Sequence, residues 1–406
     1  MLADVLDEAR PRAARPTPSA LILTLAPSRA RDIVIVLHDL GLGGTERTAI
    51  RLARRWAEAG RRVTLFCGSR EGPLASMVDK RVEVVECDPP IVRGRGSRRR
   101  LGKATAAFLA ARPADLLFVP GNYHWGVLPA VARLPEDRRP AVVAQISAPL
   151  YRRGRGLLRQ IAYNLRTRAW LSGADVAISL SPEMTRDADR VLGRSVTRCL
   201  RLPAIDDEVA RGFPTLSAPS GRLILAAGRL VAEKGFDVAL RAFARLGDPL
   251  ARFVILGDGP RRADLIALAA SLGVADRVAF PGYVADIGPW LRKARVFLLS
   301  SAYEGYAAVV VEALAAGRPV VATNCTAAAY ELLDRPERGA VVPIGDVDAM
   351  AEGLRQVLAA RPFPPQRLAA AVAGHRIGPI AQAYLDVFDE VHARRSGAST
   401  PLSRAA

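Results

Sequence analysis

Two carboxylates stand out in an otherwise small and apolar stretch, residues 300–323, which reads SSAYEGYAAVVVEALAAGRPVVAT. They are Glu304 and Glu312, the second in a run that predicts a buried helix. An ionised carboxylate in such surroundings is costly unless it accepts strong hydrogen bonds. A vicinal diol such as a ribose offers two donors to Glu312, whereas an internal ion pair with a distant arginine is the alternative. The stretch therefore predicts a sugar-binding site or a buried ion pair.

Two cations share one loop in the segment AAGRLVAEKGFDVALRAF, namely Arg229 and Lys234. The loop follows a short apolar run and precedes an amphipathic one, so we expect it to join a strand to a helix. An arginine provides a planar fork of donors and a lysine provides a point charge, a combination that suits a diphosphate. A solvated surface pair is the alternative.

A glycine turn opens the segment GLGGTERTAIRLARRWAEAG, in which Gly43 and Gly44 precede a predicted amphipathic helix. Such a turn lets the backbone approach an anion at a helix N-terminus. The segment lacks the full G-x-G-x-x-G spacing of a dinucleotide site, and an ordinary turn is the alternative.

Composition limits the remaining classes of function. The chain has 406 residues, 50% of them hydrophobic, which is enough for two or three domains. Its net charge of +18 comes almost entirely from arginine, as expected from a coding bias, so it argues only weakly for a nucleic-acid partner. The four cysteines are scattered without C-x-x-C spacing, so we expect no metal site and no disulfide framework, and a reducing cytoplasmic location.

Short β-branched runs alternate with stretches of helical length along the chain, the pattern of parallel sheets. We therefore predict an α/β protein made of two Rossmann-like, doubly wound halves that face a central crevice at the carboxyl ends of their strands. The predicted divisions are a poorly ordered extension (1–30), a first domain (31–205), a linker (206–221), a second domain (222–375), a helix packing back on the first domain (376–393) and a disordered tail (394–406).

Four blocks of the second half, GRLVAEKG, VILGDGP, VAFPGYVADI and the stretch 300–323, resemble the retaining glycosyltransferase family 4 in order and spacing. The family has the GT-B fold of two Rossmann domains. In the first half, GLGGTERTAIRLARRWAEAGRRV resembles the glycine loop and helix of the same family, and ISLSPEMTRD with LRLPAIDDE resembles the end of its first domain. The resemblance spans about residues 32–360.

The resemblance implies roles for the residues named above. Arg229 and Lys234 would hold the diphosphate of a nucleotide-sugar donor, Glu312 would bind its ribose, and Glu304 would lie beside its sugar. The same motifs imply further donor contacts from Gly43, Gly44, Gly282, Tyr283, Gly305 and Tyr306.

His124, in the segment GNYHWG after a predicted strand, is placed by the resemblance against the sugar or phosphate, and a structural histidine is the alternative. The chain departs from the family where EGFG or EGxP becomes EGYAA, and where PNG-(I/V)-D becomes LPAID.

The implied activity is transfer of a sugar, from a UDP-sugar by family frequency, to a glycan or lipid-linked acceptor in cell-surface polysaccharide or glycolipid biosynthesis. The resemblance implies retention of configuration, and the cations would replace a metal, so no cofactor is expected. Two other classes of protein remain as alternatives. A nucleic-acid-binding protein would explain the charge but shows no known module, and an NAD-dependent Rossmann protein would need the missing glycine spacing.

The basic excess lies mainly in the first half and favours peripheral docking on an anionic membrane face, with solvated arginines as the alternative. Leu157, Leu158 and Ile161 would add an apolar stripe to a predicted helix. The arginines concerned are Arg93, Arg95, Arg98, Arg99, Arg100, Arg152, Arg153, Arg155 and Arg159.

Overall fold

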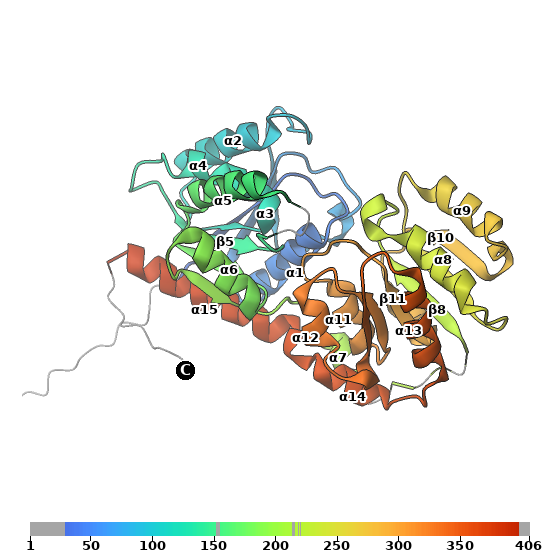
Figure 1. The fold of residues 1–406 in the computed structure, drawn as a ribbon. Helices are drawn as coiled ribbons and strands as arrows, with labels where there is room; N and C mark the ends of the chain where they lie inside the picture. The colour runs from blue at the N-terminus through green and yellow to red at the C-terminus, as the bar shows by residue number, and fades with distance from the viewer. Residues whose placement is uncertain (1–28, 152–154, 213–215, 218, 220, 398–406) are drawn as a thin grey trace, which may run out of the picture.

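The computed structural model describes residues 29–151, 155–212, 216–217, 219 and 221–397. Most of the expected N-terminal extension and of the expected C-terminal tail therefore lies outside the described residues. Two separate parallel sheets, each covered by helices, make up the described part of the chain (Figure 1).

The first sheet has seven strands in the order β3-β2-β1-β4-β5-β6-β7. Most of its central strands are buried along their whole length, as apolar strands with helices on both faces must be. The strands are β1 (Asp32–Leu37), β2 (Arg62–Cys67), β3 (Glu83–Glu86), β4 (Leu116–Val119), β5 (Ala141–Ile146), β6 (Val176–Ser179) and β7 (Thr197–Cys199).

The second sheet has six strands in the order β10-β9-β8-β11-β12-β13. The central pair, β8 and β11, places the loops that follow these two strands side by side. The strands are β8 (Leu223–Ala227), β9 (Arg252–Leu256), β10 (Val278–Gly282), β11 (Val296–Leu299), β12 (Val320–Thr323) and β13 (Gly339–Val342).

Long helices follow most strands of both sheets, as the alternating sequence pattern predicts. They are α1 (Gly44–Glu58), α2 (Ser97–Ala111), α5 (Leu157–Leu171), α6 (Pro182–Leu192), α8 (Phe236–Leu246), α9 (Arg262–Ser271), α11 (Ala308–Ala315), α13 (Val347–Ala359) and α15 (Ile377–Arg395).

The remaining helices are short, and residues 125–134, where the sequence predicts a single helix, form shorter pieces. Their length gives too little periodicity for a prediction. They are α3 (Gly121–His124), α4 (Leu128–Val131), α7 (Asp207–Arg211), α10 (Gly288–Lys293), α12 (Ala327–Leu332) and α14 (Pro365–Ala371).

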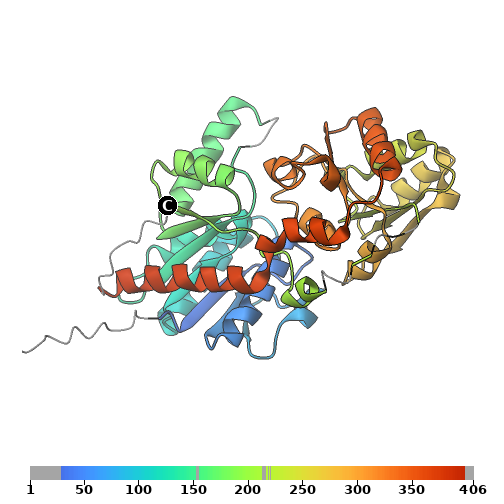
Figure 2. The same ribbon diagram turned by 90° about the horizontal axis from the view of Figure 1, so that it is seen from below.

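The last helix, α15, lies along the first domain although it follows the second in sequence, as Figure 2 shows. The indole N–H of Trp56 on α1 donates to the carbonyl of Ala381 at 3.1 Å. The rings of Tyr384 and Phe388 pack around the same indole. The packing completes the core on one face of the first sheet.

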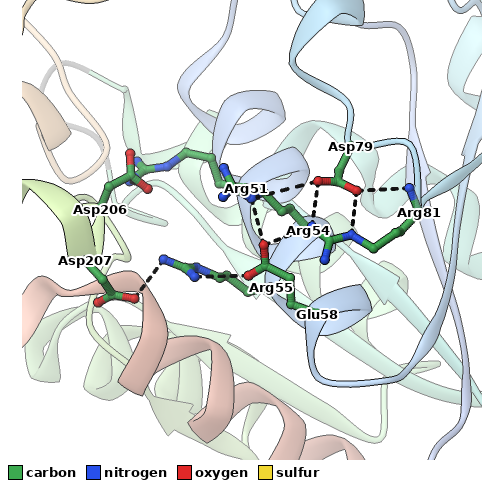
Figure 3. Close-up of polar contacts among 8 residues, drawn as sticks. All are labelled: Arg51, Arg54, Arg55, Glu58, Asp79, Arg81, Asp206 and Asp207. Carbon is green, nitrogen blue, oxygen red and sulfur yellow. Dashed lines mark hydrogen bonds and ion pairs between the residues drawn. The ribbon is translucent and has the colours of Figure 1, made fainter.

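The chain crosses between the domains twice, and the two crossings pair with each other. Ile205 forms a parallel bridge with Arg376, and the N–H of Ile377 donates to the carbonyl of Ile205 at 2.8 Å. Two arginines of α1 bind the same segment. Arg51 pairs with Asp206 at 2.9 Å and Arg55 with Asp207 at 2.8 Å (Figure 3). The beginning of the expected linker is thus anchored to the first domain.

Candidate active site

A cavity of about 490 Å³ lies between the two domains. Its volume is within the range of sites for small molecules and cofactors. Loops from the carboxyl ends of strands in both sheets line it, as expected of a crevice between doubly wound halves. The predicted residues that it brings together are Gly43, Gly44, Arg229, Lys234, Tyr283, Glu304, Gly305, Tyr306 and Glu312.

Lys234 and Glu304 form an ion pair at the centre of this site. The ammonium nitrogen of Lys234 lies 2.6 Å from Oε1 of Glu304, and the hydroxyl of Ser301 donates to the same oxygen at 2.7 Å. The two side chains are only 22% and 14% exposed. Gly235 permits this arrangement, because an added Cβ there would lie 2.2 Å from the carbonyl oxygen of Ser300. The site therefore holds a fixed cation next to a carboxylate.

Arg229 lies in the same loop as Lys234 and lines the cavity with an exposed side chain. None of the ion pairs among the described residues involves it. The adjacent loop after β9 brings Gly257 and Asp258 to the cavity, which sequence reasoning missed. Gly257 is required there, because an added Cβ would lie 1.9 Å from the carbonyl oxygen of Gly228. The two loops thus leave open space beside the side chains of Arg229 and Lys234.

Helix α11 begins at the cavity wall, so its first N–H groups lack partners within the helix and its N-terminus favours negative charge. Its N-cap, Ala307, has φ 60° and ψ 60°, the left-handed region that side chains other than glycine avoid. This is the position where the sequence departs from the EGFG pattern. Strained backbone concentrates at functional sites, and here it directs the start of the helix into the cavity.

Glu312 lies one turn further along α11 and also lines the cavity. Burial raises the pKa of its carboxyl, and the positive charges of Arg51 and Arg47 act in the opposite direction. No hydrogen bond or ion pair of the Glu312 carboxylate occurs among the described residues. The internal ion pair considered for this residue is therefore absent from the described part of the chain.

Two arginines of α1, Arg47 and Arg51, extend the site from the first domain. Arg47 donates to the hydroxyl of Tyr283 across the cleft at 3.4 Å. Their spacing of one helical turn puts both on one face of α1. That spacing is visible in the sequence, but a charged helix face is usually solvated. The spacing alone therefore could not predict that the two arginines face the second domain.

The glycine residues of the prediction have different positions. Gly43 is the N-cap of α1, where a Cβ would lie 2.0 Å from Oε2 of Glu46, and Gly44 faces open space. Gly305 meets the first domain, because an added Cβ would lie 2.2 Å from the carbonyl oxygen of Ser147. Gly282 does not line the cavity. Its carbonyl accepts from the N–H of Gly257 at 2.8 Å, which ties the end of β10 to the loop after β9.

His124 does not line the cavity, unlike the other residues predicted to be catalytic. The side chain is 1% exposed and both ring nitrogens are engaged. Nε2 accepts from the backbone N–H of His38 at 3.1 Å, and Nδ1 lies 2.6 Å from the carbonyl of Pro120. Burial lowers its pKa, which keeps the ring neutral. His124 thus links the segments that follow β1 and β4, which is the structural role considered as the alternative.

Among the described residues, no three side chains of His, Cys, Asp or Glu lie close enough together to hold a metal ion. No described helix is long and apolar enough to cross a membrane.

Two known domain families match the chain. Residues 221–360 match "Glycosyl transferases group 1", and residues 43–204 match "Glycosyl transferase 4-like domain". The chain belongs to the group 1 glycosyltransferases. Together the two matches span about three quarters of it, and each corresponds to one of the two Rossmann-like domains.

Curated glycosyltransferases match part of the chain. The chain is 38% identical over 137 residues to the lipopolysaccharide core biosynthesis glycosyltransferase LpsE of Rhizobium meliloti, which is 34% of this chain and 39% of that protein. It is 33% identical over 137 residues to a diphospho-undecaprenol 4-alpha-N-acetylgalactosaminyltransferase of Campylobacter jejuni, which is 34% of this chain and 37% of that protein. The chain thus matches less than half the length of these relatives.

Solved structures of glycosyltransferases share the architecture over nearly their full length. Anabaena Alr3699/HepE in complex with UDP superposes with a TM-score of 0.68 at 17% identity, covering 88% of this chain and 100% of that chain. The sucrose-phosphate synthase of Thermosynechococcus elongatus gives a TM-score of 0.69 at 20% identity, covering 89% and 99%. At these identities the likeness shows the GT-B fold, which confirms the predicted fold class.

Proposed function

We propose that the chain is a retaining glycosyltransferase that moves a sugar from a nucleotide-diphosphate sugar, by preference a UDP-sugar, to a glycan or lipid-linked acceptor. The observation that carries the proposal is the convergence of a fixed cation, a carboxylate and a helix N-terminus on one cavity between two Rossmann-like domains. The names of the relatives, which include lipopolysaccharide biosynthesis enzymes, support an acceptor in cell-surface polysaccharide or glycolipid synthesis.

The chemistry is electrostatic. Breaking the bond between the anomeric carbon and the diphosphate oxygen leaves negative charge on the phosphate, which Lys234, Arg229 and the N-terminus of α11 would stabilise. The acceptor hydroxyl oxygen forms the new bond on the same face of the sugar. Because the new bond forms on the face from which the phosphate leaves, the configuration is retained. The proton of the acceptor hydroxyl passes to the departing phosphate oxygen. The developing charge is met by protein cations, so we propose that transfer needs no metal.

Glu312 would bind the nucleotide ribose, because its carboxylate lines the cavity and has no internal partner among the described residues. Two hydroxyl donors of a ribose would supply the hydrogen bonds that a partly buried carboxylate needs. Glu304 would lie beside the donor sugar, held in place by Lys234 and Ser301.

The experiment that tests the activity is a screen of nucleotide-sugars against lipid-linked and soluble glycan acceptors, read by product mass. We expect a product with one added sugar, an anomeric configuration equal to that of the donor, and unchanged yield in excess EDTA. An inverted product would contradict the retaining mechanism. Loss of product in EDTA that Mn²⁺ or Mg²⁺ restores would contradict the metal-independent one.

We also propose that the first domain docks on the anionic cytoplasmic face of a membrane. Four apolar side chains of α5 face solvent: Leu157, Leu158, Ile161 and Leu165, which are 76%, 81%, 46% and 64% exposed. Their spacing puts them on one side of the helix. Arg159 lies in the first turn of the same helix and Arg155 just before the helix, whereas Arg152 and Arg153 are outside the described residues.

Co-sedimentation with vesicles tests the docking. Binding to phosphatidylglycerol vesicles should weaken strongly at about 0.5 M salt and should be reduced in Leu158→Glu. Leu250→Glu is the matched control, because Leu250 is 69% exposed on the second domain. Equal binding to neutral vesicles, or equal loss in both variants, would contradict the proposed surface.

A further inference from the structure

A row of alternating arginine and aromatic side chains extends from the rim of the cleft to helix α5. Tyr123 follows Asn122, whose side-chain oxygen accepts from the backbone N–H of Ser147, a cavity residue, at 2.9 Å. The guanidinium carbon of Arg98 lies 5.2 Å from the ring centroid of Tyr123 and 5.6 Å from that of Trp170. The row therefore starts beside the reaction site and crosses from α3 to α5.

On α5 the row continues through Arg166 and Tyr163. The guanidinium carbon of Arg166 lies 5.0 Å from the ring centroid of Trp170 and 5.8 Å from that of Tyr163. Arg155 also contacts Tyr163, with its guanidinium carbon 3.9 Å from the ring centroid. The three aromatic residues are partly buried, so they form a fixed surface.

The position of Arg98 is set before any ligand arrives. Its stem runs along Gly126, where an added Cβ would lie 3.1 Å from the Cβ of Arg98. Stacking on aromatic faces restricts a guanidinium but leaves its in-plane N–H groups available for two parallel bonds to a phosphate or carboxylate. Less conformational entropy is then lost when an anion binds.

The charges in this row are not neutralised equally. Arg93, at the edge of the row, binds the carboxylates of Asp39 and Glu46. Among the described residues, no ion pair neutralises Arg98 or Arg166. Two restrained and unneutralised guanidiniums on one surface make a site for an anionic ligand rather than for a neutral glycan alone.

We propose that Arg98 and Arg166 bind the diphosphate group of a lipid-linked acceptor. The inference rests on the proposed function for the idea that an acceptor enters this cleft. The acceptor sugar would then extend past Tyr123 toward the cavity, and its lipid would leave along α5, where the exposed Leu157 and Leu158 are. The diphospho-undecaprenol in the name of the Campylobacter jejuni relative is a group of this chemical class.

Isothermal titration of the full chain with geranyl diphosphate tests the proposal. Saturating UDP is present throughout so that the donor site is filled. The double variant Arg98→Gln/Arg166→Gln should bind at least about tenfold more weakly, the loss expected from charge-assisted hydrogen bonds. Lys103→Gln/Arg168→Gln is the matched control, since it removes two exposed charges from the same two helices, and its affinity should be unchanged.

Two further ligands show whether the diphosphate or the lipid part of geranyl diphosphate is bound. Inorganic pyrophosphate should show the same ranking of variants, and geraniol should not bind. Equal weakening in both double variants would show a general charge effect, and unchanged affinity or an absence of binding to the wild type would also overturn the proposal.

A single variant at Gly126 serves as a second test in case the double variant does not fold. Gly126→Ala keeps both charges but displaces Arg98, so it should weaken geranyl diphosphate binding severalfold while UDP binding is unchanged. If geranyl diphosphate binds as expected and UDP does not bind the wild type, the donor assignment fails and the anion site stands.

Discussion

The ammonium of Lys234 lies 2.6 Å from the carboxylate of Glu304, which joins the loop after β8 to the loop after β11. Both strands are neighbours at the centre of the second sheet. The pair keeps a cation inside the cleft in the absence of a ligand, at the position where we propose that the leaving diphosphate is stabilised.

Removing that cation should slow transfer more than it affects folding. Lys234→Ala is expected to lower the rate by about 10²- to 10³-fold, as for the loss of one preorganised donor to developing charge. Arg229→Ala should have a similar effect. Lys293→Ala is the control, because Lys293 is exposed on α10 and does not line the cavity. Steady-state kinetics would contradict the assignment if both site variants turned over at the wild-type rate.

The carboxylate of Glu312 should contribute to nucleotide affinity. Glu312→Ala is expected to weaken UDP binding by about 1.5 to 3 kcal/mol, if the carboxylate accepts charge-assisted bonds from the ribose. The surface variant Glu352→Ala should bind like the wild type. Calorimetry showing equal affinity in the Glu312 variant would remove this residue from the ribose site.

The same residue predicts a pH dependence of binding. Burial raises the pKa of the Glu312 carboxyl, so its protonation begins at a higher pH than for an ordinary glutamate. Since the charged form accepts the stronger hydrogen bonds, UDP affinity should fall as the pH drops through this raised pKa. Glu312→Gln should flatten the profile, and an unchanged profile in that variant would assign the titration to another group.

Relief of backbone strain gives a prediction about stability. Ala307→Gly should raise the free energy of unfolding by about 1 kcal/mol, because glycine adopts the left-handed conformation without a penalty. Ala308→Gly, at the first helical position of α11, should instead lower it. Chemical denaturation that gave both variants the same sign would show that the Ala307 conformation is not strained.

His375 predicts a loss of stability in acid. Burial lowers its pKa from 6.5 to about 4, so between these values the unfolded chain binds the proton and the folded chain does not. Stability then rises with pH across this window, and lowering the pH from about 7.5 to 5 should cost about 2 kcal/mol from this residue. Unfolding curves of His375→Asn at both pH values should show a smaller difference than the wild type. An equal difference in the variant would assign the effect elsewhere.

Much of the second domain's site was predictable because its residues lie in contiguous motifs at strand ends. Glu304, Lys234 and Glu312 need only the local pattern of strand, loop and helix to be placed. Arg47 and Arg51 could not be assigned in this way, because their role depends on the second domain approaching across the cleft. His124 shows what spacing leaves open: it follows a strand as predicted, but its side chain turns inward to the N–H of His38.

Thermal shift with UDP tests the central claim most directly, because a ligand that binds only the folded state stabilises it by RT ln(1 + [L]/Kd). UDP should raise the melting temperature of the wild type and of Lys293→Ala, and should raise it less in Lys234→Ala and Glu312→Ala. NAD and duplex DNA should have no effect. Stabilisation by NAD or DNA but not by UDP, or an equal UDP shift in all four proteins, would contradict a nucleotide-diphosphate site in this cleft.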